Sequence, residues 1–228
     1  MARGGERTGM LVVLEGLDGS GKSTQLALLR AWLAAQGLPP VMIKAPDYED
    51  ESSVLVRQYL GGRFGSRPED VGAYAASAFY AVDRYASFRT KWSEDYRAGR
   101  IILADRYTTS NAYHQAAKLP AAQWPGFFDW LEDFEYGKLG IPRPDLVLFL
   151  DMPPQLSWAL VARRYEGNEQ RRDIHEADRT YLLACRETAL AAAAALGWEV
   201  VPCVRGTNPL TPEEIHEDIR ARVWRHIR

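Results

Sequence analysis

Short runs of apolar residues alternate along this chain with longer stretches in which apolar residues recur every three or four positions. The longer stretches predict helices, and the short runs are almost continuously apolar, which is typical of strands covered on both faces in a parallel sheet. The expected strands are MLVVLE (10–15), VMIKAP (41–46), RIILAD (100–105), DLVLFLD (145–151) and WEVVPCV (198–204). The expected helices are 23–36, 69–98, 155–164, 174–196 and 211–227, with a peripheral helix in the aromatic-rich part of 118–144.

The residues at the helix ends support these boundaries. Gly37, Gly99 and Gly197 directly follow three of the expected helices, and glycine is the usual residue just beyond a helix. Thr211 can cap the last helix, with Pro212 at its first position. Strands that alternate with helices predict a doubly wound α/β fold, a three-layer α/β/α arrangement around a parallel sheet. We expect one domain over residues 1–228, because no repeat or linker divides the sequence.

Composition and charge exclude several classes of protein. The 228 residues are 46% hydrophobic and 25% charged with a formal net charge of −2, whereas a general nucleic-acid binder would usually carry a basic excess. No apolar stretch approaches the ~20 residues that span a bilayer, and no apolar segment follows the charged N-terminus as in a secretion signal. We expect a cytoplasmic protein that binds neither nucleic acid nor membrane. Cys185 and Cys203 lack metal-ligand spacing and are expected to be reduced, buried thiols.

Residues 16–23 match the pattern GxxxxGK[ST] between an apolar strand and a helix, the setting in which this motif binds nucleotide phosphates. Glycines let successive backbone amides turn toward one anion, and the helix N-terminus adds its dipole. Lys22 is expected to reach the β- and γ-phosphates, and Ser23 to hold Mg²⁺ through its hydroxyl. The candidate ATP-binding residues are Gly16, Leu17, Asp18, Gly19, Ser20, Gly21, Lys22, Ser23 and Thr24.

The rest of the sequence favours a kinase over a GTPase switch. No NKxD motif follows a strand, so the usual guanine-binding element is absent from the sequence. A kinase needs an acceptor site, and ligands of open α/β sheets bind at the carboxyl ends of the strands, where Asp105 and Arg106 lie. Asp105 could bind Mg²⁺ through water and Arg106 could clamp an acceptor phosphate. The alternative for this pair is a simple surface salt bridge.

Tyr80 and Arg84 are four residues apart within the expected helix 69–98, and so lie on one helix face. An aromatic ring one turn from a guanidinium suits a base, because the ring stacks on the base while arginine donates to its acceptors. The alternative is that the two side chains only pack against their neighbours.

The segments LEGLDGSGKSTQ, FYAVDRYAS, DRYTTSNAYHQ and PDLVLFLDM resemble the motifs of the thymidylate kinase family, in the order of that family. The resemblance extends over nearly the whole chain, from Leu11 to about Arg222. It implies the P-loop nucleoside monophosphate kinase fold, with a five-stranded parallel sheet and a LID segment, usually in a homodimer. It also implies transfer of the γ-phosphate of Mg·ATP to dTMP, which gives dTDP.

The resemblance assigns roles to individual residues. Arg106 would grip the dTMP phosphate with Asp105 near the magnesium, and Asp18 would face the acceptor nucleotide rather than the phosphate cradle. Tyr80 would stack on thymine, and Arg84 would donate to thymine O4 and so reject cytosine, which presents an amino donor there. Further candidate substrate contacts are Tyr48, Arg57, Asn111 and His114, the last where some relatives carry a tyrosine that guards against a ribose 2′-hydroxyl.

Phosphoryl transfer needs cationic groups around the moving phosphoryl group. Some members of the family place an arginine in the P-loop after the aspartate, where this chain has Gly19, so we expect the LID to supply the positive charge. We place the LID at about 163–173. Arg171 and Arg172 are the best candidates to close on ATP, followed by Arg164, and closure would exclude water.

The pair Asp173 and Glu176 has a structural and a functional interpretation, and so does Asp151. Asp173 and Glu176 match a capping box, although Glu176 is also a candidate contact near the nucleotide. Asp151 ends an apolar strand like a metal-binding aspartate, but the prolines that follow favour a helix cap. Arg205 follows the last strand, where it is expected to border adenine.

Two alternatives to a dTMP kinase stay open. The first is a deoxynucleoside kinase or another nucleoside monophosphate kinase, and the second is a P-loop module that senses nucleotides without turnover. The residues Asp105 and Arg106 favour a monophosphate acceptor, and the arginines of the LID argue against a module without turnover.

Overall fold

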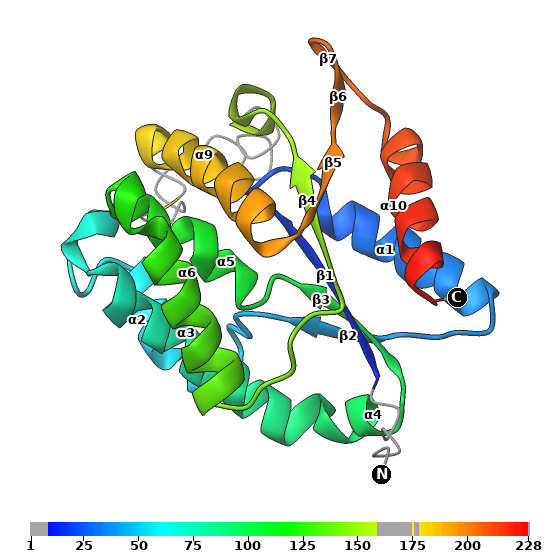
Figure 1. Ribbon diagram of the computed structural model, residues 1–228, viewed down its shortest axis with the longest axis horizontal. Helices are drawn as coiled ribbons and strands as arrows, with labels where there is room; N and C mark the ends of the chain where they lie inside the picture. The colour runs from blue at the N-terminus through cyan, green and yellow to red at the C-terminus, as the bar shows by residue number, and fades with distance from the viewer. Residues whose placement is uncertain (1–8, 159–174, 176–177, 228) are drawn as a thin grey trace.

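Five parallel strands form the centre of the protein (Figure 1). The computed structural model describes residues 9–158, 175 and 178–227. The strands lie in the order β2-β3-β1-β4-β5, which confirms the predicted fold class. Their bounds are β1 (Met10–Gly16), β2 (Val41–Lys44), β3 (Ile101–Asp105), β4 (Leu146–Asp151) and β5 (Glu199–Pro202). The last strand is shorter than predicted, because the chain then enters an antiparallel hairpin of β6 (Val204–Arg205) and β7 (Asn208–Pro209).

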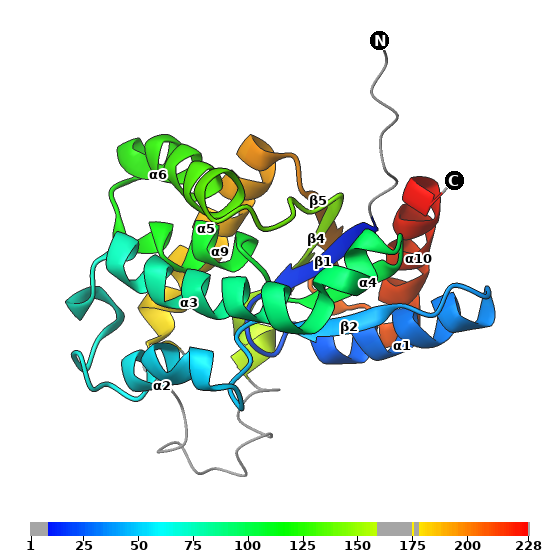
Figure 2. The ribbon, with the colours of Figure 1, turned by 90° about the horizontal axis from the view of Figure 1, so that it is seen from below.

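Helices cover both faces of the sheet (Figures 1 and 2). One face carries α1 (Lys22–Ala35) and α10 (Pro212–Ile227), which pack against each other. The other face carries α3 (Ala73–Ser87), α5 (Thr109–His114), α6 (Trp124–Glu132) and α9 (Arg179–Leu196). Shorter elements are α2 (Val54–Leu60), α4 (Ser93–Arg97), π-helical turns at Phe88–Trp92 and Asp133–Lys138, and 3₁₀ turns at Glu51–Ser53, Pro68–Asp70, Ala116–Lys118 and Ala121–Gln123.

Burial on both faces explains why the strands are apolar without alternation. In β1, Leu11 and Val13 belong to the cluster that packs against α9, whereas Val12 and Leu14 belong to the cluster under α1 and α10. Side chains point to alternate faces of a strand, so a two-sided core needs an apolar residue at every position.

Local hydrogen bonds explain where α3 and α9 begin. The helix expected from residue 69 begins at Ala73, because the Asp70 carboxylate accepts a hydrogen bond from Arg67 N and closes a separate turn. The helix expected from residue 174 gives way to α9, which begins at Arg179. There the Asp178 side chain accepts a hydrogen bond from Tyr181 N at 2.9 Å. The proposed cap by Asp173 and Glu176 lies outside the described residues.

Of the two other helix caps predicted from the sequence, the one at Thr211 is confirmed and the one at Asp151 is wrong. Thr211 and Glu214 cap α10 reciprocally. Thr211 N donates to Glu214 Oε2 at 2.8 Å, and Glu214 N donates to Thr211 Oγ1 at 3.2 Å. The predicted Asp151 cap is wrong. The carboxylate of Asp151 instead accepts two hydrogen bonds from Arg186, at 2.7 and 2.9 Å. Helix begins only at residue 154, and the expected helix 155–164 leaves the described residues after 158.

The two cysteines are buried and unpaired, as predicted. Within the described residues, no helix is long and apolar enough to cross a membrane.

Candidate active site

The site lies where the strand order of the sheet reverses. β1 pairs with β3 on one side and with β4 on the other, and Leu14 is in register with Asp105 while Gly16 is in register with Leu150. Such a switch point leaves a crevice outside the carboxyl ends of the strands. The loop after β1 and the segment after Asp105 therefore meet at one edge of the sheet.

The loop of residues 16–21 has the backbone of a phosphate cradle. Gly16 has φ 150°, and an added Cβ would lie 2.6 Å from Ser20 Oγ, so a side chain does not fit there. Gly21 has φ 93° and caps α1, and a Cβ at this position would meet nothing within 4 Å. The space in front of the first turn of α1 is therefore open. The unpaired N–H groups of a helix start are available there to an anion.

The ammonium group of Lys22 lies inside this loop. Its Nζ donates to the carbonyl oxygens of Gly16 at 2.9 Å and Leu17 at 3.1 Å, and the side chain is only 8% exposed. Burial, together with the nearby charge of Arg106, lowers the pKa of Lys22 to about 8 despite the carboxylates around it. A cation that is poorly solvated gains more from an incoming phosphate than an exposed lysine would.

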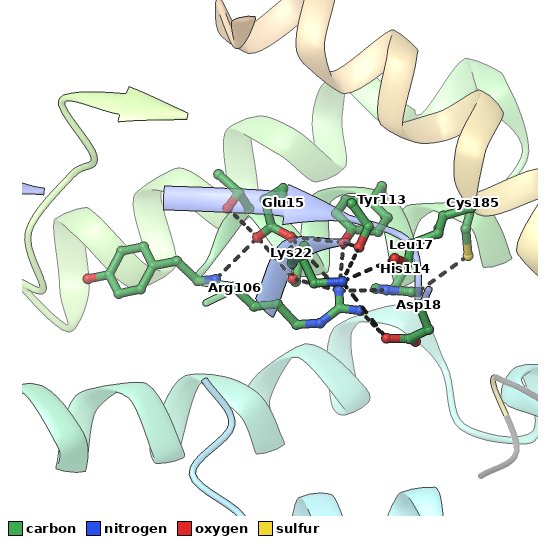
Figure 3. A network of polar contacts seen from close by, with 12 residues as sticks. Glu15, Leu17, Asp18, Lys22, Arg106, Tyr113, His114 and Cys185 are labelled. Carbon is green, nitrogen blue, oxygen red and sulfur yellow. Dashed lines mark hydrogen bonds and ion pairs between the residues drawn. The ribbon is translucent and has the colours of Figure 1, made fainter. Parts of the chain in front are cut away.

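The guanidinium of Arg106 lies at the centre of a network of polar contacts between the loop after β1 and the segment after β3 (Figure 3). Its Nη2 donates to Asp18 Oδ1 at 2.7 Å, and its Nη1 donates to Tyr113 Oη at 2.7 Å. Burial would lower the pKa of Arg106, but Tyr113 and the nearby carboxylates outweigh it and raise the pKa well above its usual value. The backbone of Arg106 has φ 67°, a left-handed conformation that is uncommon for a residue with a side chain.

Asp18 joins the two halves of the site. Its Oδ1 lies 3.9 Å from Lys22 Nζ in addition to the bond with Arg106. Burial acts to raise the pKa of this carboxyl, but Arg106 and Lys22 hold it well below its usual range. Asp18 is therefore a charged group that faces Arg106, and its expected orientation toward an acceptor nucleotide stays a prediction.

The buried carboxylate of Glu15 was not among the residues predicted from the sequence. It is fully buried and accepts hydrogen bonds from Thr109 Oγ1 at 2.7 Å, Ser110 Oγ at 2.8 Å and Tyr113 Oη at 2.8 Å. It also accepts from Tyr107 N at 3.2 Å. One carboxylate thus anchors the segment after β3 to the end of β1. The signal was a charged residue inside an otherwise apolar strand.

The side-chain oxygens of Asp105 and Ser23 are of the kind that a magnesium ion prefers. Asp105 Oδ1 is buried and makes no hydrogen bond among the described residues, so it lacks a partner that a cation or a metal-bound water would supply. Ser23 is exposed at the first turn of α1. No group of three or more His, Cys, Asp or Glu residues in the described part of the chain could hold a metal. Mg²⁺ bound with substrate phosphates needs only one or two protein ligands.

His114 lies behind Arg106. Burial and the charge of Arg106 keep the pKa of His114 well below its usual value, so the ring is neutral. Its Nε2 is 3.3 Å from Arg106 Nη1 and must accept, because arginine only donates. The proton then sits on Nδ1, which faces Cys185 Sγ at 3.5 Å. His114 contacts Arg106, and its role toward the sugar stays a prediction.

Tyr80 and Arg84 lie buried on α3, 9% and 3% exposed. Tyr80 packs edge-on against Tyr59, with ring centroids 6.4 Å apart. Arg84 forms a two-bond ion pair with Glu135, a partner that the sequence analysis missed because nothing in its local pattern marks it. Asn111 is also within reach of Glu135, with Nδ2 3.4 Å from Oε1. The expected base-binding residues therefore share one region.

Two further candidates, Arg57 and Arg205, are exposed and make their contacts with other groups. Arg57 is exposed, and its Nη1 donates to the carbonyl oxygens of Tyr48 at 2.7 Å and Asp50 at 2.8 Å. The Arg205 side chain is 81% exposed and lies 3.5 Å from Glu214. The LID at 163–173 with Arg164, Arg171 and Arg172, and also Glu176, lie outside the described residues.

Comparisons with known proteins agree on one family. A family model for thymidylate kinase matches residues 14–219. Thymidylate kinase from Mycobacterium tuberculosis is 30% identical over 195 residues, which cover 83% of this chain and 87% of the relative. Thymidylate kinase from Danio rerio is 28% identical, with 94% and 89% covered. The solved structure of thymidylate kinase from Candida albicans has a TM-score of 0.67 and 22% identity and covers 95% of this chain and 91% of that one, a likeness in fold.

Proposed function

Because this chain belongs to the thymidylate kinase family, we propose that it transfers the γ-phosphate of Mg·ATP to dTMP, giving dTDP and ADP in dTTP biosynthesis. It is a phosphotransferase with the P-loop nucleoside monophosphate kinase fold. The observation that carries the proposal is the position of Asp18 between Lys22 and Arg106, 3.9 Å and 2.7 Å away. These two cations would hold the donor and acceptor phosphates on either side of one carboxylate.

On the donor side, the loop of residues 16–24 surrounds the ATP phosphates. Lys22 leaves its contacts with Gly16 and Leu17 and turns toward the β- and γ-phosphates, which suit its partly desolvated charge better than two carbonyl oxygens do. Positioning and charge neutralisation supply most of the acceleration in such an in-line transfer.

On the acceptor side, Arg106 binds the dTMP phosphate. Its orientation is set in advance by Asp18 and Tyr113, so little side-chain freedom is lost on binding. The dTMP phosphate is already an anion that can attack, so a strong general base is not needed.

Ser23 and Asp105 would hold the magnesium ion. When bound, the ion neutralises charge that develops on the phosphates. The unpartnered Asp105 Oδ1 supports this assignment.

On the base side, the ring of Tyr80 stacks on thymine while Arg84 donates to thymine O4. Asn111 lies beside them at the polar edge of the base. We propose that Tyr48 and Arg57 lie near the acceptor phosphate. Arg205 is proposed to lie near adenine. Glu176 is proposed to lie near the nucleotide.

An acceptor panel tests this function. With Mg·ATP and a coupled assay of ADP release, we expect dTMP to be the best acceptor, and dCMP, dGMP and thymidine to be poor ones. Faster turnover of thymidine would favour a deoxynucleoside kinase. The absence of turnover with every acceptor would favour a nucleotide-sensing module.

Replacing Arg171 and Arg172 together by alanine should lower kcat by about 100-fold, because cations close to the moving phosphoryl group act in the transition state. The KM for dTMP should change little. Steady-state kinetics measure both values. The matched control replaces two exposed arginines of α10, Arg220 and Arg225, by alanine and should keep wild-type kcat. Equal kcat in the two double variants would contradict the role of the LID.

The remaining proposals concern organisation. We propose one domain over residues 1–228, with the LID at about 163–173, and assembly as a homodimer, which the family resemblance implies. Cytoplasmic localisation stays a prediction.

A further inference from the structure

The carboxylate of Glu135 is contacted by three side chains on the proposed base side of the site. Arg84 donates from Nε to Oε2 at 2.6 Å and from Nη2 to Oε1. Thr108 Oγ1 donates to Oε2 at 3.0 Å, and Asn111 Nδ2 lies 3.4 Å from Oε1. The side chains of Arg84 and Glu135 are 2% and 0% exposed. A carboxylate this deeply buried is tolerated only when it is paired and hydrogen-bonded, so each of these donors is directed at it.

This ion pair fixes which edge of Arg84 can meet a ligand. A guanidinium is planar and rigid, and its Nε and Nη2 edge is occupied by Glu135. Nη1 lies on the remaining side, 3.5 Å from the carbonyl oxygen of Tyr107. A base that approaches Arg84 therefore meets the Nη1 donors.

The same carboxylate fixes the amide of Asn111. Its Nδ2 is directed at two acceptors, Ser77 O at 3.3 Å and Glu135 Oε1 at 3.4 Å. Only the nitrogen of an amide can donate, so the nitrogen must face these acceptors and the oxygen must face away from them. Asn111 can then offer an acceptor, but no donor, to a ligand.

We propose that Glu135 is a positioning residue that sets the pyrimidine specificity of the acceptor site. It holds Arg84 as a donor and Asn111 as an acceptor. Thymine presents the complementary pair, an O4 acceptor beside an N3–H donor, whereas cytosine presents an amino donor beside an N3 acceptor. Both protein groups therefore discriminate in the same direction. The inference rests on the proposed function, because it takes dTMP as the acceptor.

The test is Glu135→Gln, which keeps the shape of the side chain but turns one acceptor into an amide donor. In either orientation of the amide, that donor faces an N–H group of Arg84, so Arg84 must reorient. With the amide nitrogen at the position of Oε1, it also faces Asn111 Nδ2. We expect the ratio of kcat/KM for dTMP to kcat/KM for dCMP to fall by about 10-fold or more, since a polar site discriminates strongly only while its groups are correctly oriented. The KM for dTMP should rise, and the KM for ATP should stay within about 2-fold, because ATP does not contact these residues.

The matched control is Glu132→Gln. Glu132 precedes the same π-helical turn and pairs with Arg143 at the surface, where the two side chains are 34% and 56% exposed. It should keep the wild-type ratio. A second variant, Thr108→Val, removes one donor to Glu135 without changing side-chain shape, and it should lower the ratio by about 3-fold.

The outcomes separate positioning from stability. A variant that only folds less well loses active enzyme, and this lowers kcat for dTMP and dCMP equally while the ratio stays unchanged. Melting temperatures of all variants identify such a loss. If Glu135→Gln does not fold, the ratio measured for Thr108→Val tests the proposal instead. An unchanged ratio in the folded variants overturns the role of Glu135. Wild-type protein that phosphorylates neither nucleotide overturns the proposed function instead.

Discussion

Replacing Lys22 by alanine should lower kcat by about 100- to 1,000-fold, the effect typical of removing one group that stabilises charge in a transition state. The Lys22 ammonium lies inside the loop of residues 16–21, and Arg106, the other cation beside Asp18, is already bonded to Asp18 and Tyr113. Among the residues that the structure describes, Arg106 is therefore not free to replace Lys22. Steady-state kinetics with saturating dTMP measure the loss.

The matched control is Lys138→Ala, because Lys138 is 69% exposed and pairs with Asp133 in the π-helical turn. It should keep the wild-type kcat. Near-normal turnover of Lys22→Ala would refute the assignment of the donor site.

The lowered pKa of Lys22 adds a pH dependence to the same prediction. The amine is charged below its pKa of about 8 and neutral above it. The kcat/KM for ATP reports the free enzyme, so it should fall as the pH rises through about 8. Bound ATP favours the charged form of the Lys22 amine. The fall in kcat should therefore begin at a higher pH than the fall in kcat/KM.

Replacing Arg106 by lysine should raise the KM for dTMP by about 10- to 100-fold and also lower kcat. Lysine keeps the charge beside Asp18, but it cannot bond Asp18, Tyr113 and a phosphate through one planar group. Removing the charge altogether, as in Arg106→Ala, would also take away the cation that pairs with Asp18 and lies near Glu15, which lowers folding stability as well as binding. Lysine is therefore the better test of binding.

Kinetics with dTMP and isothermal titration of the acceptor measure the effect of Arg106→Lys. Arg100→Lys is the control, since Arg100 is half-exposed and pairs with Asp95 at the far end of β3. If the dTMP affinity of Arg106→Lys equals that of the control, Arg106 does not bind the acceptor phosphate.

The sequence predicted the sheet and located the two elements that we propose bind phosphate, because each has a local signal. Continuous apolar runs marked all five strands, and the spacing of residues 16–23 marked the loop between β1 and α1. Asp105 and Arg106 could be placed because parallel strands bring their carboxyl ends to one edge of the sheet. In each case a short stretch of sequence contains the whole reason for the structure.

The sequence did not predict the carboxylates that organise the site. Glu15 and Glu135 bind partners 92 to 98 and 24 to 51 residues away in the chain, so no local pattern relates them to those partners. Glu15 interrupts an apolar strand, which could have suggested a buried acceptor. Glu135 lies in a π-helical turn, where neither a 3.6-residue nor a two-residue period predicts which side chain faces inward.

The backbone of Arg106 limits what evolution can place at this position. A left-handed residue other than glycine costs about 1–2 kcal/mol in backbone strain. Glycine would remove that strain but has no side chain to bind a phosphate. Lysine would keep the strain and replace only part of the contacts that arginine makes. The conformation and the chemistry thus favour different amino acids, and arginine is retained at the expense of the backbone. Position 106 has no neutral substitute, so it should be among the least tolerant positions of the chain to drift.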